Sequence, residues 1–279
     1  MNLLVQEVVK MGERQLREAG ISNAKAEAEL LYCHLMKIDR AKFVLRWSKE
    51  AKDREVDQFL NLCEKRASRI PLQHIIGNVN FMGYNFKVKP GVLIPRPETE
   101  LLVTEVLKRI NPKESLLDLC CGTGVIGISL CKEMNLKGTL ADISDEALDL
   151  ASENARLNGV KVGFLKTDMF EGLKRKKFNI ITCNPPYIPT DEIPHLLVEV
   201  REHDPHAALD GGEDGLNFYR IIAEQAASHL KKRGLLALET GWNQGDHIRK
   251  LLEEVQEFED IEKIKDLNGF DRILLARKK

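Results

Sequence analysis

Residues 118–127, Asp-Leu-Cys-Cys-Gly-Thr-Gly-Val-Ile-Gly, begin at the end of the first predicted strand, 116–119, and lead into a segment expected to be helical. Gly122, Gly124 and Gly127 in this stretch satisfy the pattern G-x-G-x-x-G. Because glycine has no Cβ atom, the backbone there can turn tightly, approach a ligand closely and pack the next helix on the strand. The stretch therefore predicts the first strand, loop and helix of an α/β nucleotide-binding sheet.

Two acidic residues follow at the ends of the next predicted strands. Asp142, in Ala-Asp-Ile-Ser, ends the second strand at the distance where an acid accepts hydrogen bonds from ribose hydroxyls. The third strand ends in Thr167-Asp168-Met169, an acidic and apolar pair that suits the edge and the face of an adenine ring. These positions predict an adenosine-containing cofactor and leave NAD and S-adenosylmethionine (SAM) as alternatives.

The motif Asn184-Pro185-Pro186-Tyr187 directly follows the fourth predicted strand. Two prolines in a row cannot continue a helix or a sheet ladder, so the backbone must leave the strand with carbonyl oxygens that lack secondary-structure partners. An asparagine amide, a proline carbonyl and a tyrosine ring together suit a planar group that carries an NH2. A plain surface turn is the alternative. A dehydrogenase would need a proton donor near its nicotinamide, so the motif favours SAM over NAD.

Composition excludes several classes of function. The chain has 279 residues, a net charge of −1, 43% apolar residues and 30% charged residues. These fractions are typical of a globular protein with a hydrophobic core. The near-neutral charge argues against duplex DNA as the main partner. No apolar run approaches the ~18 residues that span a bilayer, and the N-terminus lacks a signal-peptide pattern. The six cysteines show no C-x-x-C or Cys/His ligand spacing, so we expect reduced thiols, no metal site and a cytoplasmic location.

The chain divides into three parts by pattern. Residues 1–72 are expected to form a bundle of short helices, 73–92 a β-hairpin linker, and 93–279 the cofactor-binding domain. In the last part apolar strands alternate with helical patterns, which indicates a parallel, doubly wound sheet. The six predicted strands are Leu116–Leu119, Thr139–Asp142, Val162–Leu165, Asn179–Cys183, Leu235–Glu239 and Arg272–Ala276.

Within the helical region, apolar residues recur at helical spacing. Met11, Leu30 and Val44 belong to the apolar positions of the first, second and third expected helices. Ser22 is a candidate N-cap for the second helix and Ser48 for the fourth.

Two longer strings complete the motifs: 94–100, Ile-Pro-Arg-Pro-Glu-Thr-Glu, and 208–216, Ala-Leu-Asp-Gly-Gly-Glu-Asp-Gly-Leu. With the glycine loop, Asp142-Ile143-Ser144 and Asn-Pro-Pro-Tyr, they make nearly the whole chain resemble the release factor glutamine methyltransferase (HemK-type) family. The resemblance implies a class I SAM-dependent methyltransferase fold, with a doubly wound, mostly parallel seven-stranded sheet behind a helical domain and a hairpin. It implies SAM-dependent N5-methylation of the glutamine in the Gly-Gly-Gln motif of bacterial class I peptide chain release factors, with S-adenosylhomocysteine as product.

The chain departs from the family pattern at two positions. Cys120 stands where the loop usually has its first glycine, and Asp204 stands where many members have glutamate. Three alternatives stay open. A sister group that methylates a glutamine of a ribosomal protein typically lacks Glu98-Thr99-Glu100. An adenine-N6 nucleic-acid methyltransferase would need a basic groove or a target-recognition domain, and a ligand sensor without catalysis leaves the amide-shaped site unexplained.

The motifs and the resemblance together predict three sets of site residues. The catalytic residues are Asn184, Pro185 and Tyr187. The cofactor-binding residues are Asp118, Cys120, Cys121, Gly122, Thr123, Gly124, Asp142, Ile143, Asp168, Met169 and Asn184. The substrate-binding residues are Asn184, Pro185, Pro186, Tyr187, Arg96 and Glu98, the last two placed by the resemblance at the start of a helix expected at 98–109.

Two acidic residues have alternative interpretations. Asp118 either binds the methionine amino group of SAM or caps the loop, and Glu239 either walls the pocket or makes a hydrogen bond at its strand end. For the whole chain we expect a monomer whose helical part docks the protein substrate, with no metal, membrane or stable nucleic-acid partner.

Overall fold

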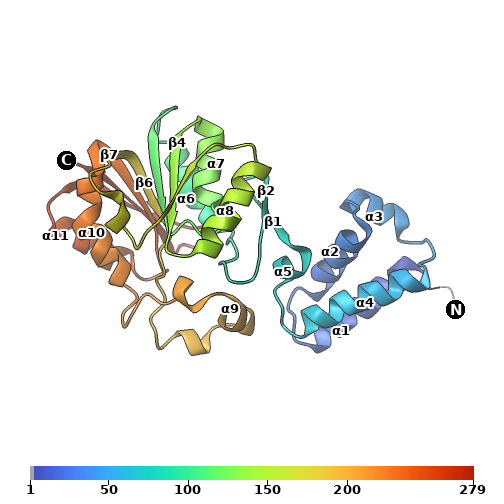
Figure 1. Ribbon diagram of the computed structural model, residues 1–279. Coiled ribbons are helices and arrows are strands. Elements are labelled where there is room, and N and C mark those ends of the chain that lie inside the picture. The colour runs from blue at the N-terminus through green and yellow to red at the C-terminus, as the bar shows by residue number, and fades with distance from the viewer. Residues whose placement is uncertain (1–2) are drawn as a thin grey trace. The chain divides into compact units, whose positions relative to one another are not determined.

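The computed structural model describes residues 3–279, and their packing divides the chain after Gly77. The first unit is a bundle of short helices (Figure 1). They are α1 (Val5–Glu18), α2 (Ala24–Met36), α3 (Arg40–Arg46), α4 (Asp53–Ala67) and α5 (Leu72–Ile76). The sequence predicts that the helical region ends at residue 72, but α5 extends it because this short helix packs on α2 and α4.

Some apolar positions of these helices face away from the bundle core. Met11, Leu30 and Val44 are exposed, although all three fit the helical apolar pattern. Their neighbours Leu31 and Phe43 occupy the core instead. Where two adjacent positions are apolar, helical spacing alone does not decide which of them is buried.

The predicted N-caps of two helices are displaced along the chain. The N-cap of α2 is Asn23 and not Ser22, and the N-cap of α4 is Lys52 and not Ser48. Ser48 lies in a connecting segment that pairs with the chain start, where the Ala51 amide donates to the Leu3 carbonyl at 2.8 Å. This pairing delays the start of α4.

A β-hairpin opens the second unit. Strands β1 (Asn78–Phe81) and β2 (Tyr84–Lys87) pair antiparallel, within the predicted range 73–92. Phe81 and Phe86 are buried in the core of the second unit, with their rings edge to face at 6.1 Å. The hairpin is therefore a packed element of the second unit and not a separate linker.

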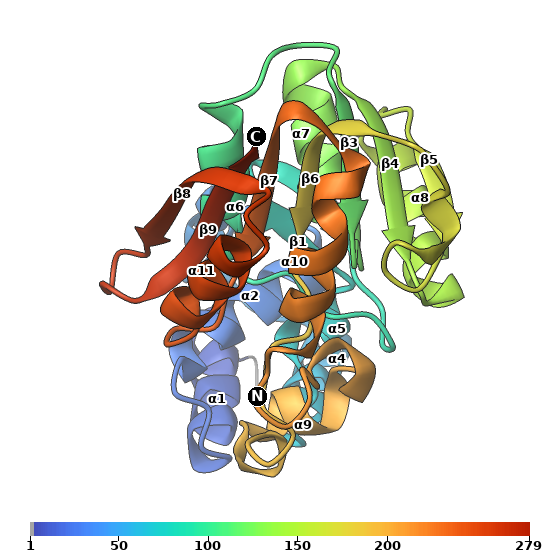
Figure 2. The same cartoon turned by 90° about the vertical axis from the view of Figure 1, so that its left-hand side faces the viewer.

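The second unit is built on a seven-stranded sheet in the order β5-β4-β3-β6-β7-β9-β8 (Figure 2). The strands are β3 (Ser115–Leu119), β4 (Lys137–Asp142), β5 (Gly163–Lys166), β6 (Phe178–Cys183), β7 (Leu230–Glu239), β8 (Phe258–Lys265) and β9 (Asp271–Lys278). Strands β3 to β7 run parallel to one another, and β9 runs antiparallel to both β7 and β8. This confirms the predicted doubly wound, mostly parallel sheet, whose ligand edge is the one with the carboxyl ends of the strands.

Strand β8 is the one that the sequence pattern does not reveal. Five of its eight residues are charged, in Phe-Glu-Asp-Ile-Glu-Lys-Ile-Lys. Its apolar residues Phe258, Ile261 and Ile264 lie at every third position and not at every second, and its pairing with β9 shifts register between Glu259 and Glu262. As the edge strand, β8 can carry these charges, which also protect an edge from pairing with other chains.

Helices cover both faces of the sheet (Figure 1). One face carries α6 (Thr99–Leu107), α7 (Val125–Met134) and α8 (Asp145–Leu157), and the other α10 (Asn217–His229) and α11 (Gly245–Glu254). The connection from β6 to α10 contains α9 (Val198–His203) and short 3-10 helices at Ile193–His195 and His206–Ala208; a further 3-10 helix lies at Glu171–Leu173. Among residues 3–279, no helix is both long enough and apolar enough to cross a membrane.

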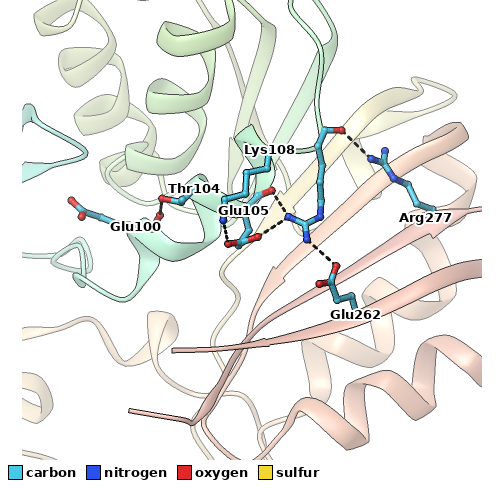
Figure 3. Close-up of polar contacts among 7 residues, drawn as sticks. Glu100, Thr104, Glu105, Lys108, Glu262 and Arg277 are labelled. Carbon is cyan, nitrogen blue, oxygen red and sulfur yellow. Dashed lines mark hydrogen bonds and ion pairs between the residues drawn. The ribbon is translucent and has the colours of Figure 1, made fainter. Parts of the chain in front are cut away.

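The end of α6 is tied to the antiparallel edge of the sheet (Figure 3). Arg109 donates to Glu105 at 2.6 Å and to Glu262 of β8 at 2.9 Å. Arg277 of β9 donates to the carbonyl oxygen of Arg109 at 2.9 Å. These contacts tie the carboxyl end of α6 to β8 and β9.

Candidate active site

A cavity of about 490 Å³ lies at the carboxyl edge of the parallel strands, a volume typical of small-ligand sites. Most of the predicted site residues line it: Arg96, Cys120, Cys121, Gly122, Thr123, Asp142, Ile143, Asp168, Met169, Asn184 and Pro186. The remaining predicted residues stand behind or beside its wall: Glu98, Asp118, Gly124, Pro185 and Tyr187.

Asp118 is completely buried beneath the glycine loop. One carboxylate oxygen accepts the Gly127 amide at 2.9 Å, and the other accepts the Thr182 hydroxyl at 2.7 Å. A Cβ atom at position 127 would lie 2.8 Å from the Asp118 carboxylate, so glycine permits this bond. Burial raises the pKa of Asp118 to about 7. These contacts favour the interpretation that Asp118 caps the start of α7 and holds the loop.

The loop itself needs residues that accept the left-handed backbone. Gly122 and Gly124 have φ angles of +51° and +80°. Cys120 also has a positive φ, +53°, which explains why the family usually has glycine there. A side chain in this region costs about 1–2 kcal/mol, so Cys120 adds local strain to the loop.

The predicted adenosine side of the cavity combines carboxylates with apolar surface. Asp142 accepts the amides of Gly122 at 2.8 Å and Ser144 at 3.0 Å, which fixes its carboxylate at the cavity wall. Ile143 is 59% exposed although it is apolar, and Met169 forms part of the same wall. A Cβ at Gly122 would find its nearest neighbour only at 3.9 Å, so the open space there is available to a ligand. This donor set fits the adenosyl part of SAM: a carboxylate for the ribose and an apolar surface for the base.

The Asn-Pro-Pro-Tyr turn is held from outside by the string at 208–216. The Ile188 amide donates to the Leu209 carbonyl at 2.9 Å, and the Gly211 amide donates to the Ile188 carbonyl at 2.8 Å. Gly215 lies so close that a Cβ there would be 2.4 Å from the Tyr187 carbonyl oxygen. The glycines of this string therefore allow it to pack against the backbone of the turn.

Within the turn, the two prolines are buried and Asn184 and Tyr187 are half-buried. The Tyr187 carbonyl accepts Gln244 Nε2 at 2.8 Å, which anchors the turn to the loop after β7. Burial raises the pKa of the Tyr187 hydroxyl to about 12, so the ring stays neutral at physiological pH.

Glu239 lies next to Asn184, at the carboxyl end of β7. Its side chain is 1% exposed, and burial raises its pKa to about 7. The neighbouring Thr99 and Asn184 and the positive charge of Arg272 lower this pKa, but by less than burial raises it. One of its oxygens, Oε2, has no hydrogen-bond partner. The hydrogen-bonded strand-end interpretation of this residue fits the structure better than a pocket wall, since Glu239 does not line the cavity.

Arg96 connects two segments of the cavity wall. It forms an ion pair with Asp204, whose side chain is 2% exposed. This pair joins the stretch before α6 to the stretch 205–208, both of which line the cavity. Glu98 is exposed, precedes the first residue of α6 and does not line the cavity.

Sequence reasoning missed part of the wall. Val92, Leu93, Thr99, Ala207 and Phe218 line the cavity without belonging to any predicted site set. The two strings at 94–100 and 208–216 were a signal for this region, because both lie beside these residues in the sequence. Which of their neighbours reach the cavity depends on how the loops fold over the sheet.

The chain is similar in sequence and in fold to known methyltransferases. Residues 7–77 match the family model of the PrmC N-terminal domain, and residues 95–201 match that of the methyltransferase small domain. Among solved structures, a methyltransferase from Pyrococcus furiosus is similar with a TM-score of 0.55 at 20% identity, covering 71% of this chain and 90% of its own. At this identity the likeness shows the fold alone, and it confirms the predicted methyltransferase fold.

Two relatives are similar along almost their whole length. A release factor glutamine methyltransferase from Thermodesulfovibrio yellowstonii is 42% identical over 260 residues, which cover 90% of this chain and 92% of the relative. One from Clostridium botulinum is 36% identical over 283 residues, which cover 99% and 100%. The chain therefore belongs to the release factor glutamine methyltransferase family.

Proposed function

We propose that this chain methylates the side-chain nitrogen N5 of the glutamine in the Gly-Gly-Gln motif of bacterial class I peptide chain release factors, with SAM as methyl donor. The observation that carries the proposal is the position of Asn184. Asn184 lines the same cavity as Asp142 and Met169, directly beyond the carboxyl end of β6. The names of the relatives, which extend over the same length, support the same substrate.

The chemical difficulty is that an amide nitrogen is a poor nucleophile, since its lone pair is delocalised into the carbonyl. When bound, SAM would supply the electrophile, a methyl group on a positively charged sulfur. The S–C bond would break as the N–C bond forms, S-adenosylhomocysteine would leave, and the methylated nitrogen would lose one proton to water. The Asn184 side-chain oxygen and the Pro185 carbonyl accept the two N–H hydrogens of the glutamine and hold its nitrogen in line with that methyl group. Both bonds strengthen as positive charge develops on the nitrogen, so they stabilise the transition state more than the ground state.

Tyr187 stacks on the plane of the substrate amide in this proposal. Its hydroxyl is protonated at physiological pH, as that of an ordinary tyrosine is, and burial raises its pKa further, to about 12. A neutral ring attracts the developing positive charge by about 0.5–2 kcal/mol. Pro186 forms part of the cavity wall and keeps the turn rigid.

The other site residues hold SAM and the substrate loop. Asp142 accepts hydrogen bonds from the ribose, Ile143 and Met169 enclose the adenine, and Asp168 meets its edge. The loop under the methionine part of SAM is formed by Cys120, Cys121, Gly122, Thr123 and Gly124. Asp118 holds this loop in place and does not contact SAM itself. Arg96 and Glu98 border the entrance used by the substrate, with Arg96 fixed by Asp204.

The test is a methylation assay with the purified chain, SAM and both class I release factors, read by peptide mass spectrometry. We expect one added methyl group on the Gly-Gly-Gln glutamine. Asn184→Ala should lower the rate by about 10²-fold or more, the effect of removing a single oriented polar group from an active site, with SAM affinity nearly unchanged. Asn80→Ala, on the exposed side of the hairpin, is the matched control and should behave as wild type.

Two results would contradict the proposal. Unchanged turnover by Asn184→Ala would refute the role of its amide. A chain that binds SAM but methylates neither factor would refute the substrate, and ribosomal proteins and then nucleic acid would be assayed next.

The helical unit, residues 1–77, docks the intact release factor in this proposal, and the chain acts as a cytoplasmic monomer. A lower KM for the intact factor than for a free Gly-Gly-Gln peptide would support docking outside the cavity. Equal KM values would remove that role. Light scattering of the purified chain tests the monomer.

A further inference from the structure

Two aromatic side chains are exposed side by side at one end of the sheet. Trp242, in the loop after β7, is 59% exposed, and Phe270, in the turn between β8 and β9, is 47% exposed. Their rings meet edge to face with centroids 5.9 Å apart. Leu267, in the same turn as Phe270, is fully exposed. We call these three residues the apolar patch. Exposed apolar side chains that gather in this way are typical of interaction surfaces.

The apolar patch lies at the carboxyl edge of the parallel strands, next to the Asn-Pro-Pro-Tyr turn. Gln244, two residues after Trp242, donates from Nε2 to the Tyr187 carbonyl at 2.8 Å. Two residues span at most about 7 Å, so Trp242 stands close to the motif. No residue of the patch lines the cavity, however. The patch therefore borders the candidate site without belonging to the space that the cofactor would fill.

Hydrogen bonds hold the two loops of the patch in place. The Phe270 amide donates to Asp266 Oδ1 at 3.1 Å, and Arg272 Nη2 donates to Asp266 Oδ2 at 3.1 Å. The Thr240 amide donates to the Arg272 carbonyl at 2.8 Å, which joins this turn to the loop of Trp242. The apolar side chains therefore stand on a preformed surface. Such a surface binds a partner with a smaller loss of conformational freedom than a loop that must first become ordered.

The charges that flank the patch are mostly paired with one another. Arg272 is paired with Asp266 at 3.1 Å, and Lys263 is paired with Asp271 at 3.2 Å. Lys265, just before the turn, adds a single further basic residue. A strand of nucleic acid needs a row of basic side chains for its phosphates as well as aromatic rings for its bases. These pairs do not provide such a row, so an apolar protein segment fits the patch better.

We propose that the apolar patch binds an apolar side chain of the protein substrate, carried a few residues from the glutamine that enters the site. This inference rests on the proposed function, since a protein must lie across the surface around the cavity to place one glutamine inside it. An extended chain advances about 3.3 Å per residue, so a few residues reach from the motif to the patch. Tryptophan and other aromatic residues typically carry much of the binding energy of protein interfaces.

The test measures the binding of an intact class I release factor by calorimetry in the presence of S-adenosylhomocysteine, which has no methyl group to donate. We expect Trp242→Ala to raise Kd by about tenfold or more and Phe270→Ala by about fivefold, as the loss of interface anchors does. Phe164→Ala is the matched control for Phe270→Ala. It makes the same change at an exposed residue of β5, at the opposite edge of the sheet, and should keep the wild-type Kd.

Kinetic measurements separate docking from damage to the site. Because the patch lies outside the cavity, Trp242→Ala should raise KM for the release factor and leave kcat unchanged at saturation. The SAM affinity of this variant should equal that of wild type, which shows that the second unit is folded. Trp242→Phe keeps an aromatic ring and should recover most of the lost affinity for the factor.

The two proposals fail in different ways. A factor that is methylated but binds Trp242→Ala and wild type within about twofold, well below the effect of an interface anchor, would overturn the docking role alone. A factor that binds through Trp242 and is never methylated would refute the glutamine chemistry and leave the docking role standing. A factor that neither binds nor is methylated would overturn both.

Two other occupants of the patch would also overturn the inference. A wild-type dimer in light scattering that Trp242→Ala dissociates would assign the patch to a second copy of this chain. Binding of single-stranded DNA by wild type that is lost in Trp242→Ala would assign the patch to nucleic acid.

Discussion

Gly124 provides the sharpest test of how the glycine loop is built. Its φ angle is +80°, and a Cβ atom there would lie 2.8 Å from Ile128 Cδ1, 3.1 Å from the Ala151 Cβ and 3.1 Å from Leu140 Cδ2. Gly124→Ala therefore meets two separate costs, a left-handed backbone and a crowded core. Gly159→Ala meets only the first, because its φ is +67° and nothing lies within 4 Å of the added Cβ.

The two costs can be estimated separately. The left-handed conformation costs a non-glycine residue about 1–2 kcal/mol, and alanine recovers about 0.4–1 kcal/mol by restricting the unfolded chain. An extra carbon in a packed core costs about 1–3 kcal/mol. We therefore expect Gly159→Ala to lose about 1 kcal/mol and Gly124→Ala about 2–4 kcal/mol of unfolding free energy.

Urea unfolding followed by tryptophan fluorescence measures this difference. The chain has two tryptophans, so a Trp47→Phe background leaves Trp242 as the reporter of the second unit. Gly124→Ala should also weaken SAM binding, because the start of α7 must shift to relieve the contacts. Equal loss of stability in the two alanine variants would refute the reasoning that close packing, and not the backbone alone, requires glycine at position 124.

Three further predictions concern charged residues of the site. Arg96→Ala should lower the unfolding free energy by about 2–4 kcal/mol, because it breaks the ion pair of Arg96 with the buried Asp204 carboxylate. An Arg96→Ala/Asp204→Ala double variant that recovers nothing would contradict the pairing. Asp142→Ala should weaken SAM binding by about 10–100-fold, and wild-type affinity in calorimetry would refute its contact with the ribose. Glu239→Gln should stabilise the chain at pH 8 by up to about 3 kcal/mol. The sign follows because burial raises the folded pKa from 4.5 to about 7, so the charge costs nothing below the unfolded pKa and its full amount above pH 7. Equal stability changes at pH 4 and pH 8 would contradict it.

The local signals in the sequence located the parts of the site that depend on backbone chemistry. The glycine loop, Asp142 at a strand end and the proline pair after β6 each specify their own geometry within a few residues. Those positions could be predicted because turn formation and the meeting of strand ends at one edge follow from general rules.

The parts that escaped prediction depend on long-range packing. The pairing of Arg96 with Asp204 crosses 108 positions of sequence, and nothing near either residue indicates the other. Strand β8 was hidden because a register shift removes its period of two. Asp118 fits both a ligand contact and a loop cap in sequence, and only the distances to Gly127 and Thr182 distinguish the two.

Two buried carboxylates, near the carboxyl ends of β3 and β7, differ in how the fold accommodates them. Asp118 and Glu239 both have pKa values raised to about 7 by burial, so each costs stability at neutral pH. For Asp118 the fold itself supplies a reason: both oxygens are bonded, and one of them holds the first turn of α7 through Gly127. Glu239 has the same burial but an oxygen without a partner, and its other contacts lead to Asn184 and Thr99. The ionised form of Glu239 therefore carries an uncompensated oxygen, while that of Asp118 does not. Removing the charge of Glu239 should therefore make the chain more stable at neutral pH and above, because burial raises its pKa to about 7.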